Sequence, residues 1–215
     1  MHIPDGFLST ETWAAAWVVS AGAVGYSVKR TSRVLKDRTV PLMGVLSAFI
    51  FAAQMVNFPV MGGTSGHLLG GVLAAVLLGP YAGATALACV LTFQCLVFQD
   101  GGLTALGANI FNMAVAGTMG GYGVYRMIVK TSADKKAIIV GTAVASWFSV
   151  VLASVLCALE LAASKTAPIG VVLPAMAGVH ALIGVGEAVI TGAIVATVLK
   201  TRPDLLYTPK SSIEV

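Results

Sequence analysis

Long apolar runs, separated by short segments rich in polar residues, glycine or proline, occupy most of this 215-residue chain. A transmembrane helix needs about 20 predominantly apolar residues. The pattern therefore predicts an all-α polytopic membrane helix bundle with about seven transmembrane helices. The predicted spans are residues 12–28, 42–56, 67–78, 82–98, 105–127, 137–159 and 174–199.

The composition excludes a soluble globular protein. Apolar residues make up 57% of the chain, charged residues make up 10%, and the mean hydropathy is +0.90. We find no internal repeat and no segment typical of a soluble domain, so we expect residues 1–215 to form a single integral membrane domain. The formal net charge of +4 does not indicate a nucleic-acid partner, because in a membrane protein it mostly records which loops are cytoplasmic.

The basic residues predict an orientation in the membrane. No Lys or Arg precedes the first span, which argues against a cleaved signal peptide. Five follow it at once: Lys29, Arg30, Arg33, Lys36 and Arg38. With the N-terminus outside and the C-terminus inside, every Lys and Arg except Lys165 falls on the cytoplasmic side, as is usual for such residues. Residues 203–215 then form a short cytoplasmic tail.

The first two residues can act as a metal chelator. The α-amine of Met1, the amide nitrogen of His2 and the His2 imidazole can close one five-membered and one six-membered ring on a single ion. A planar set of nitrogen donors suits Ni(II) and Cu(II), whereas Zn(II) prefers a tetrahedron. Residues 3–6 (IPDG) predict a turn that folds a metal-binding tail of residues 1–10 back onto the bundle. The alternative is an incidental N-terminal histidine.

His67 is the second candidate ligand and could supply a fourth nitrogen. It follows the glycine-rich loop at residues 62–66 and is predicted to open a helix on the same outer side as the tail. A helix N-terminus disfavours a protonated imidazole, so this side chain is expected to stay neutral and able to coordinate. The alternative is a polar residue that caps the helix.

Other polar residues near the outer rim are candidates for supporting the ligands. Asn109 and Asn112 share a helix face and are expected to support the tail or the His67 loop, although hydrogen bonds between helices explain them equally well. Asp100 could accept an N–H from a ligand imidazole, as carboxylates often do, or could be a plain loop residue. His180 and Glu187 lie about 10 Å apart along one helix and cannot ligate the same ion, so their role stays open.

Two other classes of function are less consistent with the sequence. A self-sufficient permease or channel for divalent transition-metal cations would need polar groups through the full membrane depth, whereas here they concentrate on the outer rim. A metalloenzyme would need a motif such as HExxH or a pair of carboxylates, and the chain has neither. It also lacks a GxxxxGK[ST] phosphate loop, so we expect no enzymatic activity and no ATP hydrolysis by the chain itself.

Three motifs in the same order resemble the CbiM/NikM family, whose members are the membrane-embedded substrate-binding components of energy-coupling factor transporters for cobalt and nickel. The motifs are MHIPDGFLS at residues 1–9, NFP at 57–59 running on to GTSGHLLG at 63–70, and QDGGLTALGANIFNM at 99–113. The resemblance covers essentially the whole chain.

This resemblance implies a ligand set, a substrate and partners. It maps the metal ligands onto Met1, His2 and His67, with Ni(II) or Co(II) captured at the extracellular side of a prokaryotic plasma membrane. It also implies a transmembrane coupling subunit and two separate ATPase subunits as partners. The metal would be the transported ligand, and no cofactor is expected. The motifs do not distinguish nickel from cobalt.

Overall fold

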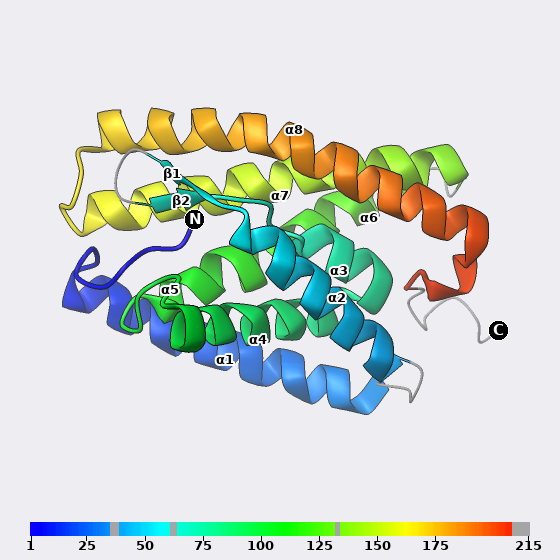
Figure 1. Cartoon of the computed structure of the whole chain (residues 1–215), viewed down its shortest axis with the longest axis horizontal. Helices are drawn as coiled ribbons and strands as arrows, with labels where there is room; N and C mark the ends of the chain where they lie inside the picture. The colour runs from blue at the N-terminus through cyan, green and yellow to red at the C-terminus, as the bar shows by residue number, and fades with distance from the viewer. Residues whose placement is uncertain (35–38, 61–63, 132–133, 208–215) are drawn as a thin grey trace.

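The computed structural model describes residues 1–34, 39–60, 64–131 and 134–207. Figure 1 shows a bundle in which the long helices run side by side along the longest axis. The fold is all-α, as predicted, apart from one short hairpin. The elements are α1 (Thr10–Val34), α2 (Thr39–Met55), β1 (Phe58–Val60), β2 (Thr64–Gly66), α3 (Gly71–Leu78), α4 (Pro80–Phe98), α5 (Leu106–Asn109), η1 (Ile110–Gly120), α6 (Gly121–Thr131), α7 (Lys135–Ala163), α8 (Ile169–Thr201) and η2 (Pro203–Leu205).

The surface of the bundle is apolar where lipid would cover it. Within the described residues, three helices are long and apolar enough to cross a membrane, namely α4, α7 and α8. On α8, large apolar side chains point away from the protein, including Leu182 at 77% exposure and Val189 at 66%. Soluble proteins rarely expose extended apolar patches of this kind. The chain is therefore a multi-pass membrane protein.

The short helix α3 lies in the centre of the bundle. Every residue of α3 is buried, and α4 folds back against it closely enough that a Cβ on Gly83 would meet the backbone of Ala74 and Ala75 at 2.9 to 3.2 Å. A helix of this length covers only about 12 Å, so it cannot cross a bilayer alone. The prediction of a helix beginning at residue 67 was wrong, because α3 begins at Gly71 after a left-handed Gly70 with φ +78°.

Two further segments differ from the simple pattern of apolar spans. The run predicted at 105–127 is helical but changes type, since α5 passes into the π-helix η1 and then into α6. The outer loop contains the antiparallel hairpin β1–β2, which pairs Phe58 with Gly66, Pro59 with Ser65 and Val60 with Thr64. Three-residue strands are too short to produce a recognisable alternation of apolar and polar residues, so they could not be predicted.

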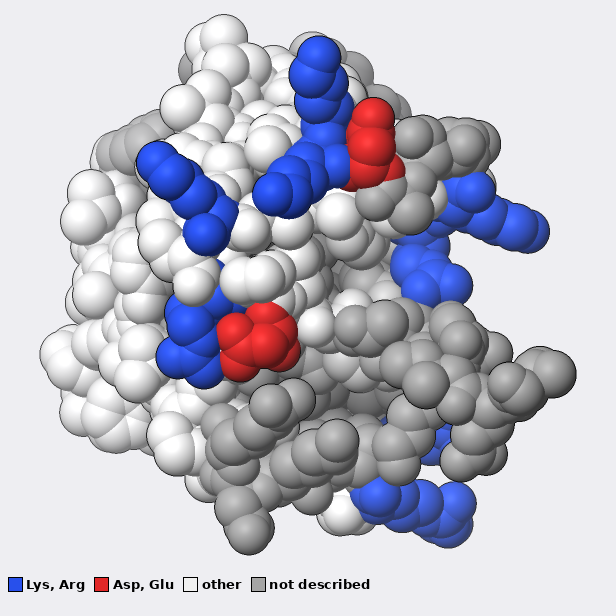
Figure 2. Space-filling view, turned by 90° about the vertical axis from the view of Figure 1, so that its right-hand side faces the viewer, with Lys and Arg blue, Asp and Glu red and all other residues white. Residues whose placement is uncertain are grey.

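The end of the bundle opposite this hairpin is basic. Figure 2 shows Lys and Arg side chains around the rim of that end. Arg33 lies in the last turn of α1, Lys130 in that of α6 and Lys200 in that of α8. Three of the basic residues used to predict the orientation, Lys36, Arg38 and Lys210, lie outside the described residues.

The described part of the predicted C-terminal tail packs onto the bundle. The backbone N–H of Tyr207 donates to the carbonyl of Val76 at 2.9 Å. The Tyr207 ring also lies against Gly79, where a Cβ would meet it at 2.7 Å. Residues 203–207 therefore close the basic end beneath α3. The rest of that tail, residues 208–215, lies outside the described part of the chain.

Candidate metal centre

The N-terminal tail folds into the bundle beside the hairpin, as the turn at residues 3–6 predicted. Figure 1 shows the N-terminus next to β2. Met1 is fully buried and His2 is 4% exposed. The α-amine of Met1 donates to the carbonyl of Ser65 and to its hydroxyl oxygen at 3.0 Å, and the His2 amide donates to the same hydroxyl at 3.2 Å. The Met1 amine and the His2 amide, two of the predicted donor nitrogens, are thereby both held at the Ser65 hydroxyl.

Asn109 and a neighbouring loop hold the tail in this position. The Ile3 N–H donates to Asn109 Oδ1 at 2.8 Å, and Asn109 Nδ2 donates to the Ile3 carbonyl at 3.1 Å. That carbonyl also accepts from the N–H of Gly102 at 2.8 Å. Further out, the Asp5 carboxylate accepts from the N–H groups of Leu103 at 3.0 Å and Thr104 at 2.7 Å. Asn109 therefore contacts the backbone of the tail that carries the proposed ligands.

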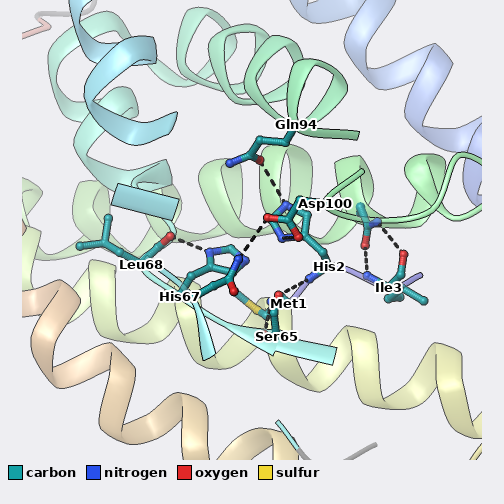
Figure 3. A network of polar contacts seen from close by, with 10 residues as sticks. Met1, His2, Ile3, Ser65, His67, Leu68, Gln94 and Asp100 are labelled. Atoms are coloured by element: carbon teal, nitrogen blue, oxygen red, sulfur yellow. Dashed lines mark hydrogen bonds and ion pairs between the residues drawn. The ribbon is translucent and has the colours of Figure 1, made fainter. Parts of the chain in front are cut away.

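The imidazoles of His2 and His67 are stacked, with ring centroids 4.6 Å apart and planes 27° apart (Figure 3). His2 Nε2 lies 3.2 Å from Gln94 Oε1, and His67 Nδ1 lies 2.8 Å from the Leu68 carbonyl. The Leu68 carbonyl only accepts, so His67 carries its proton on Nδ1, and His2 donates to Gln94 in the tautomer that is protonated on Nε2. The other two nitrogens, His2 Nδ1 and His67 Nε2, are buried without a hydrogen-bond partner in the described part of the chain. Each has a lone pair available for a metal.

Burial also removes the positive charges that would block coordination. It lowers the pKa of the Met1 α-amine from its ordinary 8.0 to about 5. Burial first, and then the nearby N-terminal charge, lowers the pKa of His2 to about 3, against the opposing hydrogen bond to Gln94. For His67, burial holds the pKa well below its ordinary value. Desolvation penalises the charged form of each base, so all three groups are neutral at pH 7.

No three His, Cys, Asp or Glu side chains converge on a possible metal position among the residues that the structure describes. Backbone nitrogen could complete a donor set at this place together with imidazole. The tail offers that chemistry, because the Met1 amine, the His2 amide and the His2 imidazole belong to adjacent residues beside His67.

Comparison with known proteins identifies the family of the whole chain. Residues 2–205 match the family described as "CbiM: Cobalt uptake substrate-specific transmembrane region". The chain belongs to the CbiM family. It is 44% identical over 208 residues to the putative fused nickel transport protein NikMN of Archaeoglobus fulgidus, covering 96% of this chain and 68% of that protein. It is 41% identical over 210 residues to a putative metal transport protein of Haloquadratum walsbyi. That match covers 97% of this chain and 94% of that protein.

A solved structure supports the fold of this CbiM chain. The crystal structure of a truncated transition metal transporter is similar with a TM-score of 0.87 at 34% sequence identity, covering 93% of this chain and 99% of that one. These relatives are named as transport proteins. The family resemblance noted from the three sequence motifs is thereby confirmed.

The loop that carries His67 in this CbiM chain is held from inside the bundle. Both oxygens of the Glu187 carboxylate on α8 accept backbone N–H groups, from Leu69 and Gly70, each at 2.7 Å. Gln54 on α2 donates to the Leu69 carbonyl at 2.8 Å. His67 therefore precedes the helix, and its burial, not a helix N-terminus, accounts for its neutral imidazole.

The sequence left the role of Glu187 open, although a carboxylate inside an apolar span already marks a functional candidate. The structure brings it to the His67 loop from α8, where it is 2% exposed. The pattern along α8 could not identify this partner, because Leu69 and Glu187 are 118 residues apart in the sequence.

Three other candidate residues make contacts of different kinds. Asp100 Oδ1 lies 3.3 Å from His2 Nδ1, so this carboxylate faces the imidazole of a predicted ligand. Asn112 Nδ2 donates to Glu160 on α7 at 2.6 Å, a contact between helices that does not involve the tail. His180 bonds through Nδ1 to the carbonyl of Met176 at 2.8 Å, within its own helix.

Proposed function

We propose that this protein captures Ni(II) or Co(II) at the outer side of the membrane, through the Met1 amine, the His2 amide nitrogen, His2 Nδ1 and His67 Nε2. The observation that carries the proposal is the buried N-terminus beside two imidazole nitrogens that have no hydrogen-bond partner among the described residues. The family description and the relatives named as nickel transport proteins support the same substrates.

The donor set explains why the substrate would be a late transition metal. The amine, amide and imidazole of adjacent residues give two fused chelate rings, and four nitrogens in a plane suit the square-planar preference of Ni(II). Binding requires the His2 amide to lose its proton, so capture releases protons. Ser65 Oγ, which accepts from the amine and from this amide, holds both nitrogens toward one side before the ion arrives.

The proposed orientation puts the metal centre outside and the basic end inside. Lys and Arg are enriched in cytoplasmic loops of membrane proteins, and they gather at the end opposite the hairpin (Figure 2). The protein would span the plasma membrane of a prokaryotic cell about seven times, with some spans broken or short, as in α3.

We propose further that import needs partner subunits. Between the His67 loop and the basic end lies α3, whose residues are all buried and apolar, and the segment ending at Tyr207 closes its far end. This arrangement favours capture over conduction by a self-sufficient permease. Energy would come from a transmembrane coupling subunit and two ATPase subunits of an energy-coupling factor transporter.

The first experiment tests the metal centre. The protein with an unextended N-terminus is loaded with nickel, its metal content is measured by elemental analysis, and its visible and magnetic spectra are recorded. We expect one nickel per chain in a diamagnetic, planar, all-nitrogen site, lost in His2→Ala and in His67→Ala. A six-coordinate paramagnetic site with oxygen ligands would contradict the proposal.

A second experiment tests the need for partners. The protein is reconstituted into vesicles with and without the coupling and ATPase subunits, and nickel uptake is followed with and without ATP. We expect binding but no sustained uptake by the chain alone. Full-rate uptake without the partners would favour the permease.

A further inference from the structure

A cavity of about 320 Å³ lies above the metal centre at the outer end of the bundle. His2 and Ser65 form part of its lining on the inner side, and Asn57, Gln99 and Asp100 form part of it near the outer loops. No Lys or Arg is among the described residues that line it. Asp100 is the one acidic side chain among them, and it is 16% exposed.

The Asp100 carboxylate touches the candidate metal centre and the outer loop at the same time. Its Oδ1 lies 3.3 Å from His2 Nδ1, and its Oδ2 accepts from Asn57 Nδ2 at 3.2 Å (Figure 3 shows Asp100 and His2). The Asn57 contact leaves Oδ1 directed at the ring nitrogen that the metal would use.

The contact between Asp100 and His2 joins a carboxylate oxygen to the ring nitrogen that the metal would use. In the tautomer in which His2 donates from Nε2 to Gln94, two lone pairs face each other across 3.3 Å. Two ligands at right angles on one ion, each with a bond of about 2.1 Å, lie about 3.0 Å apart. A cation between the two atoms would therefore turn a repulsive contact into a shared one.

The backbone around Asp100 also favours a cation at this place. Asp100 directly follows Gln99, which caps the C-terminus of the 19-residue helix α4 in a left-handed conformation with φ 56°. The C-terminal end of a helix carries partial negative charge. The carboxylate and the helix end thus act together on an ion in the cavity.

We propose that Asp100, held by Asn57, is the first ligand for a hydrated divalent transition-metal cation, which it receives in the outer cavity and passes to His2 Nδ1. Carboxylate oxygen binds an ion that still keeps most of its water, whereas the four nitrogens can bind only after the water has left. The ion leaves Asp100 when the planar nitrogen site is complete. This inference rests on the proposed function of the nitrogen centre.

The test measures nickel loading and release by stopped flow on the full chain with a free N-terminus. The variants are Asp100→Asn, Asp100→Glu and, as a matched control, Glu11→Gln, which removes an exposed carboxylate from the first turn of α1. We expect Asp100→Asn to slow loading by nickel chloride, and release to EDTA, by at least about tenfold each. Affinity and the spectrum of the loaded site should stay the same, since a ligand used only in transit affects both rates alike.

Two comparisons distinguish direct metal binding by Asp100 from general electrostatic attraction of the cation. Asp100→Glu keeps the carboxylate and should restore part of the loading rate, and Glu11→Gln should load like the parent. The deficit of Asp100→Asn should persist at about 1 M salt, where the Debye length is near 3 Å and attraction at a distance is screened.

Three results would overturn the inference. The first is that Asp100→Asn loads and releases nickel at the parental rates. The second is that the slower loading of Asp100→Asn disappears in high salt. The third is a shifted spectrum with weaker affinity at an unchanged loading rate, which would make Asp100 a resident ligand. A failure of the nitrogen centre itself is recognised separately. In that case one extra Gly before Met1 would leave equilibrium nickel binding intact whatever residue stands at position 100.

Discussion

The two halves of the proposed metal centre are held in opposite ways. The tail half, Met1 and His2, docks through backbone contacts to Ser65, Asn109 and an outer loop. The His67 half is built into the bundle by Glu187, which is buried. The tail supplies three of the four proposed nitrogens, and its Met1 amine must lose a proton when the tail docks. The loop supplies one nitrogen, from a position that Glu187 already holds. Changes to the tail should therefore affect metal binding most, and changes to the loop should affect it less.

The largest effect is expected from a single Gly added before Met1. The α-amine becomes an amide, and the new amine lies outside the five-membered ring and beyond the buried position that Met1 fills. Nickel affinity should fall by more than the roughly 10- to 100-fold that loss of a supporting residue causes. Isothermal titration measures this, with a tag after Val215 as the control. Parental affinity in the extended protein would exclude the amine as a ligand.

A second test displaces the tail without touching any ligand. A Cβ on Gly102 would meet the Asp5 backbone nitrogen at 2.2 Å and the Pro4 carbonyl carbon at 2.6 Å, and neither can move unless the tail does. Loss of the bonds that join the tail to Gly102 and Asn109, at about 1 kcal/mol each, should lower nickel affinity about 100-fold in Gly102→Ala. Titration measures the loss.

The matched control for this variant is Gly123→Ala, because a Cβ at Gly123 meets nothing within 4 Å. Circular dichroism should show equal helicity in both variants, since Gly102 lies in a loop. If Gly102→Ala binds nickel like Gly123→Ala, the tail does not need this docked position to hold metal.

The His67 half is tested by Glu187→Gln. The amide keeps one accepting oxygen, so one of the two N–H groups at Leu69 and Gly70 loses its partner and the loop shifts. Nickel affinity should fall about 10- to 100-fold, with a changed visible spectrum because His67 moves. The matched control is Glu160→Gln, which makes the same change in a carboxylate that contacts Asn112 and not the loop. Equal effects in the two variants would assign Glu187 a merely structural role.

The difference between the halves also explains what the sequence could predict. The tail chelate could be proposed from the sequence because its donors are adjacent in the chain, and the apolar spans were predictable because length and composition suffice. The support of His67 was not, because Glu187 reaches the loop only through the packing of α8. The start of α3 was misplaced because the left-handed Gly70, and not the apolar pattern, decides where the helix begins.

The last prediction concerns pH, and it acts on the tail of the metal-free protein. The Met1 amine has a pKa of 8.0 when free and about 5 when docked, so the undocked tail binds more protons over this range. Docking is then fully favourable above pH 8 and weakens as the pH falls, by about tenfold for each pH unit down to 5. His2, whose pKa falls from 6.5 to about 3, adds a second proton below pH 6.5. The docking equilibrium of the tail should therefore weaken more steeply below pH 6.5 than above it.

Hydrogen exchange reports this equilibrium at the Ile3 and Gly102 amides, whose hydrogen bonds exist only while the tail is docked. After correction for the intrinsic exchange rate, their protection should decrease from pH 8 to pH 5, with the amides of α4 as the internal reference. Constant protection would mean that the amine keeps its proton in the docked tail. The burial of a neutral N-terminus, on which the contrast between the two halves depends, would then be wrong, because a charged amine cannot share its lone pair with a metal.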